Sequence, residues 1–300
     1  MLKIAFDPIY KYNLPEGHRF PMIKYELLPE QLVYENTISE SQFFTPKKLS
    51  REQLILTHTE EYLNKLDDLN LTRKEIRNIG FPVRKELIER GKVISGGTYE
   101  GAILAMENKI AMNIAGGTHH SYSDRGEGFC IYNDIAISAN LLLNNGLLSK
   151  VLVVDLDVHQ GNGTAKIFED RPEVYTFSMH GEKNYPVRKE RSDLDIGLPD
   201  GCTDDYYLKT LYNTLPKLLE IVQPEIIFYL SGVDVIGQDK LGRLNLSIEG
   251  CKKRDEFVLK TAHKNNLPIV CSMGGGYSPN VKDIITAHAN TFRLAMDIFY

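Results

Sequence analysis

The chain contains 300 residues, of which 42% are hydrophobic and 25% charged, and its formal net charge is −5. This is the composition of a globular protein with a sizeable core, without the basic excess of a nucleic-acid binder. No apolar run approaches the roughly 20 residues of a membrane-spanning helix, and the N-terminus has no signal-peptide pattern. We therefore expect a cytoplasmic protein with no membrane span and no direct nucleic-acid partner.

The four cysteines agree with that location. They are spread along the chain and form no C-x-x-C pair, which favours free thiols in a reducing compartment. They are Cys130, Cys202, Cys251 and Cys271.

Short apolar runs rich in Val and Ile alternate along the chain with segments of helical spacing. The predicted strands are Leu2–Phe6, Ile110–Ala115, Val151–Leu156, Val174–Ser178, Ile226–Leu230 and Ile269–Ser272. The predicted helices are Glu61–Leu69, Ile131–Leu143, Asp204–Val222, Glu249–Asn265 and Val281–Phe299. Nearly continuous apolar strands are typical of a parallel sheet buried on both faces. We expect an α/β fold, a single domain over residues 1–300 with three α/β/α layers and a mainly parallel central sheet.

Local signals mark some of the boundaries between these elements. The segment Thr57-His-Thr-Glu60 resembles a capping box that opens the first predicted helix. The stretches Leu71–Val83 and His180–Gly201 contain Gly and Pro and are interpreted as long loops, which are often functional.

The densest group of ionisable residues follows the predicted strand Val151–Leu156. Asp155, Asp157 and His159 stand at alternate positions, so in an extended chain their side chains point the same way. The alternative is that Asp155 caps the following helix and His159 has an ordinary hydrogen-bond partner, but three ionisable groups in this register favour a metal site. Two buried carboxylates need compensation, and a metal ion supplies it. Carboxylate and imidazole ligands suit Zn²⁺, with Fe²⁺ and Co²⁺ as alternatives.

A further ligand is expected after the strand Ile226–Leu230. Asp234 follows this strand and would complete a three-ligand site with an open position for water, as in catalytic zinc sites. Asp239, five residues later, competes for the same role on sequence grounds.

Tandem histidines follow the strand Ile110–Ala115 after a Gly-Gly turn. Neutral imidazole is the natural general base near pH 7, so His119 and His120 are candidates for that role. Asp155 or Asn162 would orient them, since a base is usually held by a third group. Histidines of a surface loop are the alternative interpretation.

A turn of three glycines follows the last predicted strand and leads to Tyr277. Such a turn lets the backbone approach another group closely. A phenol there would donate a hydrogen bond to a carbonyl oxygen that becomes negative during attack. A phosphate-binding loop is the rival interpretation, but neither common glycine-rich phosphate pattern is present.

Together these motifs resemble the zinc-dependent histone deacetylases of the arginase/deacetylase fold, in particular the class IV branch and its bacterial relatives. The motifs occur in the family's order over essentially the whole chain, and Gln160 and the Ser-Asp-Arg-Gly before Phe129 favour class IV. The matching stretches are Gly116-Gly-Thr-His-His-Ser, Ser123-Asp-Arg-Gly-Glu-Gly-Phe-Cys-Ile-Tyr-Asn-Asp134, Asp155-Leu-Asp-Val-His-Gln-Gly-Asn-Gly, Ser231-Gly-Val-Asp-Val-Ile-Gly-Gln-Asp-Lys-Leu-Gly242 and Gly274-Gly-Gly-Tyr.

The resemblance implies a role for each residue of the predicted site. Zinc would be bound by Asp157, His159 and Asp234. His120 would be the general base, and Tyr277 would polarise the acyl carbonyl and stabilise the tetrahedral intermediate.

Other roles follow from the same resemblance. His119, paired with Asp155, would act electrostatically or as an acid. The acyl-lysine tunnel and its surroundings would be formed by Gly128, Phe129, Tyr185 and Gly275. A structural K⁺ would bind at Asp155, Asp157, His159, Ser178 and Met179.

Two positions depart from the pattern of some branches. Asn162 stands where those branches have Asp, and an amide stabilises the cation of His120 less than a carboxylate does. Class IV also carries Asn here, so the departure leaves activity expected. Tyr185 replaces Phe in the second wall of the tunnel and adds a polar tip.

The reaction implied is hydrolysis of an acyl amide, with several substrates open. They are acetyl-lysine in a protein, a longer fatty acyl-lysine, and a small acetylated amine such as a polyamine. A non-catalytic acyl-ligand binder or partner-recruiting protein is the alternative from another class, and the full set of expected groups argues against it. The sequence indicates no oligomeric state.

Overall fold

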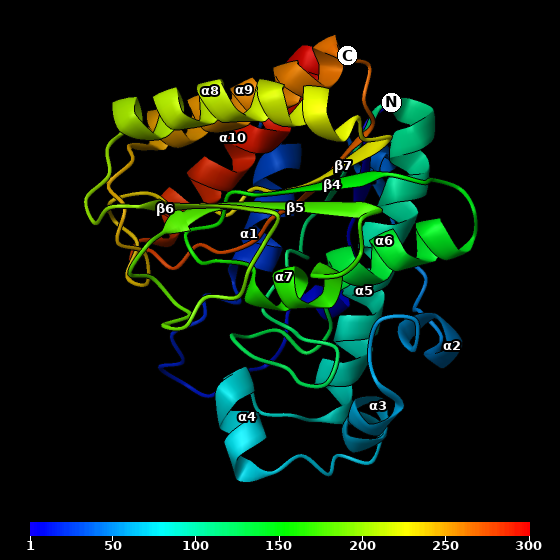
Figure 1. The fold of residues 1–300 in the computed structure, drawn as a ribbon. Helices are drawn as coiled ribbons and strands as arrows, with labels where there is room; N and C mark the ends of the chain where they lie inside the picture. The colour runs from blue at the N-terminus through cyan, green and yellow to red at the C-terminus, as the bar shows by residue number, and fades with distance from the viewer.

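The computed structural model describes residues 1–300, and a sheet of eight strands runs through it (Figure 1). The order across the sheet is β2-β1-β3-β8-β7-β4-β5-β6, and every neighbouring pair is parallel. The strands are β1 Lys3–Ala5, β2 Phe43–Phe44, β3 Ile110–Asn113, β4 Val151–Asp155, β5 Val174–Gly181, β6 Leu194–Leu198, β7 Ile226–Leu230 and β8 Ile269–Ser272. The α/β fold with a parallel central sheet is therefore confirmed.

Helices cover both faces of the sheet. In Figure 1, α8, α9 and α10 lie above the sheet and α6 and α7 below it, while the long helix α5 runs upward past the right-hand end of the sheet. Within each layer α9 packs against α8 and α10, and α6 packs against α5 and α7. The helices are α1 Lys24–Tyr34, α2 Arg51–Leu54, α3 Glu60–Asp67, α4 Arg73–Ile79, α5 Lys85–Asn108, α6 Asp134–Asn144, α7 Asn162–Phe168, α8 Asp204–Val222, α9 Ile248–Lys264 and α10 Val281–Phe299. None of them combines the length and the apolar character that crossing a membrane requires.

The core follows from the apolar runs of the strands. Along β4, Leu152 and Val154 belong to a large apolar cluster, whereas Val151 and Val153 belong to a second cluster. Because successive side chains of a strand point to opposite faces, both faces of β4 are buried. This explains why the run is continuously apolar rather than alternating.

All six predicted strands are present, β7 and β8 with the predicted bounds and the other four with ends shifted by about one to three residues. Two further strands were missed. β2 has only two residues. β6 lies within His180–Gly201, so the prediction of a continuous loop there was wrong. Partly buried and exposed residues alternate along β6, as is typical of a strand at the edge of a sheet. The strand therefore lacks the continuous apolar run by which the other strands were predicted.

Two predictions about local structure around α3 and α4 were also wrong. Thr59, not Thr57, caps α3, because its hydroxyl accepts a hydrogen bond from the backbone N–H of Tyr62. The segment predicted as a loop over Leu71–Val83 contains α4. A capping box between Thr72 and Glu75 opens this helix, and that signal is visible in the sequence.

The predicted helix Ile131–Leu143 begins later than expected. Its observed start is Asp134, because the side chain of Asn133 accepts a hydrogen bond from the N–H of Ala136 and caps the helix. The long helix α5 and the helix α1 were not predicted. Glycines that pack closely against neighbouring segments interrupt the pattern of α5, and Pro29 lies inside α1.

The four cysteines are free and buried, as expected of scattered thiols.

Buried His58 is one of the groups that hold the first residues of α6 in place. Its Nε2 lies 3.2 Å from the N–H of Asn133 and accepts that hydrogen bond. Burial lowers the pKa of His58 to about 4.

This pKa predicts a loss of stability in mild acid. An unfolded histidine binds a proton below about pH 6.5, whereas folded His58 resists protonation until about pH 4, so acid favours the unfolded chain. Between pH 7 and pH 4.5 we expect wild type to lose about 2–3 kcal/mol more unfolding free energy than His58→Gln. Urea unfolding of both proteins at the two pH values measures the difference. Equal losses would contradict the assignment.

Candidate active site

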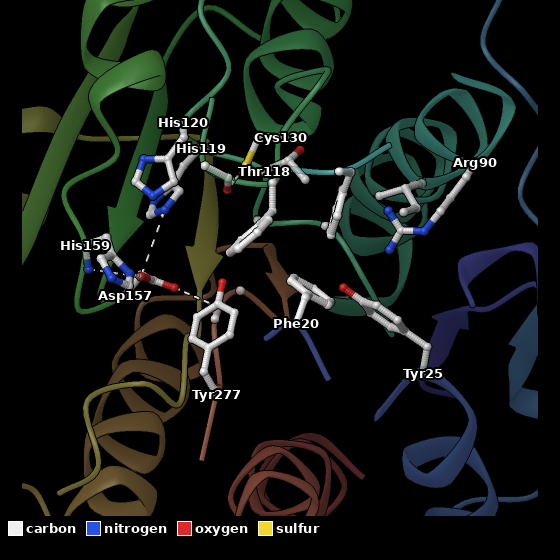
Figure 2. A pocket seen from close by; sticks show the side chains of 18 residues that line it. Phe20, Tyr25, Arg90, Thr118, His119, His120, Cys130, Asp157, His159 and Tyr277 are labelled. Carbon is white, nitrogen blue, oxygen red and sulfur yellow. Dashed lines mark hydrogen bonds and ion pairs between the residues drawn. The ribbon is translucent and has the colours of Figure 1, made fainter. Parts of the chain in front are cut away.

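The residues singled out in the sequence follow four adjacent strands of the sheet. Strands β3, β8, β7 and β4 lie side by side in that order, and all run parallel. Their carboxyl ends therefore meet at one edge, where open α/β sheets bind ligands. Residues that follow three of these strands line one pocket: the histidines after β3, Asp157 and His159 after β4, and Tyr277 after β8 (Figure 2). Asp234, which follows β7, lies behind this lining and contacts the pocket through His159.

Asp157, His159 and Asp234 form a buried group of potential metal ligands. One ligand atom from each residue lies within 4.8 Å of the others. The Nδ1 of His159 is 3.0 Å from Asp157 Oδ1 and 3.2 Å from Asp234 Oδ2. These are the three residues that the sequence indicated.

Charge and hydrogen bonding in this group fit a cation. Asp234 Oδ1 accepts a hydrogen bond from the N–H of Val158, but Asp234 Oδ2 is buried and has no donor. Burial, together with the negative charge of Asp157, raises the pKa of Asp234 to about 7. An orphaned oxygen between a second carboxylate and an imidazole nitrogen is the arrangement that a divalent ion with oxygen and nitrogen ligands would complete.

Gly275 belongs to the packing around these ligands. Its backbone N–H donates to Asp157 Oδ2 at 2.7 Å, and a Cβ at this position would overlap the carboxylate of Asp234. A glycine is therefore required here, because the chain passes directly against two of the candidate ligands.

Asp239 serves a different purpose from Asp234. Its carboxylate accepts hydrogen bonds from the N–H groups of Tyr277, Leu241 and Gly242 at 2.6–3.0 Å. It therefore orders its own loop and holds the backbone of Tyr277, and it is not a member of the ligand group.

The tandem histidines are each held by one neighbour at Nδ1. His119 Nδ1 lies 2.7 Å from Asp155 Oδ2, and His120 Nδ1 lies 2.6 Å from Asn162 Oδ1. Burial lowers the pKa of His120 well below its usual range, and the neighbouring imidazoles of His119 and His159 lower it further. The Nε2 of a neutral His120 with its proton on Nδ1 is free to accept a proton.

Tyr277 faces the same space from the end of β8. Figure 2 shows its hydroxyl directed toward Asp157 and the histidines. Its ring centroid is 6.4 Å from that of His159 and 6.0 Å from that of Phe129. Burial raises the pKa of Tyr277 well above its usual range, so the hydroxyl remains a hydrogen-bond donor.

Phe129 and Tyr185 line the mouth of the pocket together with His120, His159 and Tyr277. The Tyr185 ring meets that of His120 edge to face with centroids 5.0 Å apart, and its hydroxyl donates to Glu127. Beside Phe129, Gly128 has a φ of +53°, and a Cβ there would lie 2.5 Å from the His120 ring.

Ser178 and Met179 lie on the buried strand β5 beside β4, with Ser178 in register with Asp155. The Ser178 hydroxyl is 2.9 Å from Nδ1 of His180. The residues expected at a second cation site thus lie next to the Asp157 group, on the far side from β7.

Sequence reasoning missed a buried arginine that connects the ligand loops. Arg254 of α9 donates through Nη1 to the carbonyl of Leu156 at 3.1 Å and to that of Gly232 at 2.6 Å. These carbonyls lie within two residues of Asp157 and Asp234, and Asp255 neutralises the arginine. The sequence contained a signal for this residue. Arg254 lies three residues after Cys251 and four before Val258, which puts a charged residue on the apolar side of a predicted helix.

A second missed residue is Lys24, which is fully buried at the start of α1. Its Nζ donates to the carbonyl of Gly274 at 3.2 Å and lies over the ring of Tyr277. Burial lowers the pKa of Lys24 to about 8. No strand-end motif marks this residue in the sequence.

Comparisons with known proteins agree with this geometry. The histone deacetylase domain family matches residues 18–292. The chain is 43% identical over 296 residues to an uncharacterised protein of Picosynechococcus sp., covering 99% of each. It is 32% identical to histone deacetylase 2 of Arabidopsis thaliana, covering 89% of this chain and 72% of the relative.

Solved structures of histone deacetylase homologues have the same fold as this chain. The crystal structure of a histone deacetylase homologue from Aquifex aeolicus superposes with a TM-score of 0.84 at 26% identity, covering 98% of this chain and 84% of that one. The fold and the buried Asp-His-Asp group define a metal-binding α/β protein of the hydrolase type. The chain belongs to the histone deacetylase domain family.

The position of Arg254 predicts that metal binding depends on α9. Arg254→Met removes both carbonyl contacts and leaves Asp255 without its cationic partner, which should cost about 3 kcal/mol or more of unfolding free energy. We also expect metal affinity to fall about tenfold or more, because both ligand loops lose their support. Urea unfolding and zinc titration with a competing chelator measure the two effects.

Arg293→Met is the matched control. Arg293 pairs with Glu35 on the surface of α10 and contacts neither ligand loop. This variant should keep wild-type metal affinity. Wild-type affinity in Arg254→Met would show that the arginine does not support the ligands.

Proposed function

We propose that the protein is a zinc-dependent amidohydrolase that removes an acetyl or longer acyl group from a lysine side chain. The observation that carries the proposal is the buried group of Asp157, His159 and Asp234, with its orphaned oxygen, beside a histidine whose Nε2 is free. Membership of the histone deacetylase family supports both the reaction and the choice of zinc. We further propose that residues 1–300 form a single catalytic domain.

The proposed reaction begins with activation of a water molecule for attack on the acyl carbonyl. A divalent cation held by Asp157, His159 and Asp234 would polarise the acyl carbonyl and make water acidic enough to be deprotonated. His120 accepts that proton at Nε2, which its hydrogen bond to Asn162 leaves unprotonated. Attack of the water oxygen on the carbonyl carbon then places negative charge on the carbonyl oxygen.

The remaining steps use Tyr277 and His119. The Tyr277 hydroxyl donates a hydrogen bond to the carbonyl oxygen as it becomes negative. His119, whose Nδ1 is hydrogen-bonded to Asp155, would stabilise the developing charge or give a proton to the amine nitrogen as the C–N bond breaks. Gly128, Phe129 and Tyr185 would bind the lysine stem and its acyl group.

Two finer assignments accompany this proposal. A structural K⁺ would be held by Asp155, Asp157, His159, Ser178 and Met179, and the register of β4 with β5 supports it. Within the family we place the chain near class IV, on the Gln160 that follows His159 and the Ser-Asp-Arg-Gly that precedes Phe129.

The alternative substrate is a small acetylated amine such as a polyamine. A panel of acetyl-lysine peptide, myristoyl-lysine peptide and acetylated putrescine separates these choices. A non-catalytic acyl-ligand binder would bind the peptides without releasing free lysine.

Substitutions at Tyr277 and Asp157 test the mechanism. Tyr277→Phe removes only the donor to the carbonyl oxygen, so it should keep its zinc while kcat falls by about 100-fold or more. Asp157→Ala should lose both zinc and turnover. Zinc content by mass spectrometry and lysine release from the peptide panel provide the readouts. Unchanged zinc content and deacylation in Asp157→Ala would refute the proposed site.

A further inference from the structure

The amide of Asn162 is fixed in one orientation by groups that the mechanism does not use. Asn162 is buried, and its Oδ1 faces His120 Nδ1. Its Nδ2 lies 3.0 Å from the hydroxyl oxygen of Tyr122 and 3.5 Å from Glu127 Oε2. A carboxylate only accepts hydrogen bonds, so the side of the amide that faces Glu127 must be the NH₂ group.

The Tyr122 hydroxyl imposes the same orientation. Its hydrogen is donated to Glu190 Oε1 at 3.0 Å, so only its oxygen lone pairs face Asn162. Both neighbours of Asn162 Nδ2 are thus acceptors. A flipped amide would point its oxygen at a carboxylate and a lone pair, and both contacts would be repulsive.

Glu127 is itself firmly held. It accepts hydrogen bonds from the Tyr185 hydroxyl at 2.7 Å and from Arg125 Nε at 3.1 Å, and its side chain is only 17% exposed. The acid therefore keeps its place at the mouth of the pocket, between the wall residue Tyr185 and the buried Asn162.

We propose that Glu127 and the Tyr122–Glu190 pair are positioning residues that set the tautomer of His120 through Asn162. With the amide oxygen fixed toward His120, Nδ1 must carry the proton and Nε2 must be the acceptor. The same arrangement accounts for Asn rather than Asp at position 162, because a carboxylate there would face Glu127 at hydrogen-bond distance. The inference rests on the proposed role of His120 as the base.

A double-mutant cycle tests this arrangement. In wild type, Asn162→Asp places two carboxylates together, so we expect kcat for acetyl-lysine peptide to fall about tenfold. In Glu127→Gln, the new glutamine amide can donate to the aspartate, so the same change should lower kcat by less than about twofold. Zinc content and unfolding midpoint, measured for each variant, show whether the effect is confined to turnover.

Asp124→Asn is the matched control. Asp124 is an exposed acid that pairs with Arg125, the same arginine that holds Glu127, and it does not contact Asn162. It should leave the tenfold effect of Asn162→Asp intact, which separates contact from general charge. Equal effects of Asn162→Asp in all three backgrounds, or a gain of activity in wild type, would overturn the proposal.

The tautomer can also be read without turnover. In nitrogen-15 spectra of histidine-labelled protein, identified by comparison with His120→Ala, His120 Nδ1 should be of the protonated type and Nε2 of the unprotonated type. The opposite pattern would overturn the positioning role. If this pattern is found but no acylated substrate is hydrolysed, the proposed function fails and the positioning of His120 stands.

An independent observation concerns the charge at the mouth of the pocket. Arg19 and Arg77 line it, and neither side chain forms an ion pair or a hydrogen bond within the protein. The Arg19 guanidinium lies 5.0 Å from the centroid of the Phe129 ring. The acid at this mouth, Glu127, is occupied by Tyr185, Arg125 and Asn162. The mouth is therefore cationic, although the chain carries a net charge of −5.

We infer that the site prefers acylated amines that carry an anionic group next to the acylated lysine, such as a flanking aspartate or phosphoserine. Two free guanidinium groups attract carboxylate or phosphate and repel a basic neighbour. The charge disfavours lysine-rich tails and acetylated polyamines. This inference deepens the proposed function by naming its substrate class.

Acetyl-lysine peptides of equal length that differ only in the flanking residue test this preference. We expect kcat/KM to be about tenfold higher with flanking Asp or phosphoserine than with Lys at low ionic strength. The ratio should shrink in 0.5 M salt, because the Debye length there is only about 4 Å. Arg19→Glu/Arg77→Glu should reverse the order, whereas Lys209→Glu on α8 should leave it unchanged.

A preference for flanking Lys in wild type, or an unchanged preference for flanking Asp in the double variant, would overturn the inference. A higher kcat/KM with flanking phosphoserine than with flanking Asp would support the inference and identify phosphate as the favoured anion. Hydrolysis of none of the peptides would instead count against the proposed function.

Discussion

Two buried carboxylates beside one imidazole are the constraint on which the rest of the site depends. Asp157 and Asp234 bring negative charge into the interior, and neither is more than 1% exposed. Such burial is tolerated only when donors or a cation compensate for lost hydration. Backbone N–H groups of Val158 and Gly275 supply part of this compensation, and the orphaned oxygen of Asp234 leaves the rest to a metal.

The need to hold these charges explains features that lie outside the pocket. The two ligand loops leave neighbouring strands, and Arg254 joins them from α9 by donating to a carbonyl in each. Gly275 must be a glycine because its backbone touches the ligands. Asp239, which resembles a ligand in the sequence, instead orders the loop that carries Tyr277.

The placement of negative charge also determines the surroundings of His120. Asn162 places a neutral amide against the imidazole, while carboxylates stand one hydrogen bond further away at Glu127 and, through Tyr122, at Glu190. The presence of Asn rather than Asp at position 162 is therefore explained by the acceptor groups that surround it. The same use of Glu127 leaves Arg19 and Arg77 to set the charge of the mouth.

The sequence by itself determined the fold class and the composition of the site. Buried parallel strands are continuous apolar runs, and the motifs after four of them are local, so both can be read residue by residue. Helix α5 and strand β6 could not be read in this way, because closely packed glycines interrupt the helical pattern of α5 and the edge strand β6 is not a continuous apolar run.

Only the tertiary structure decided which residues act together. It showed that the carboxylate of Asp239 is occupied by three backbone donors, so of the two acids that follow β7 it is Asp234 that faces His159. It also brought Arg254, Lys24 and Glu127 to the site. Their contacts join residues distant in the chain, and the strand order that creates those contacts is a property of the whole sheet rather than of any segment.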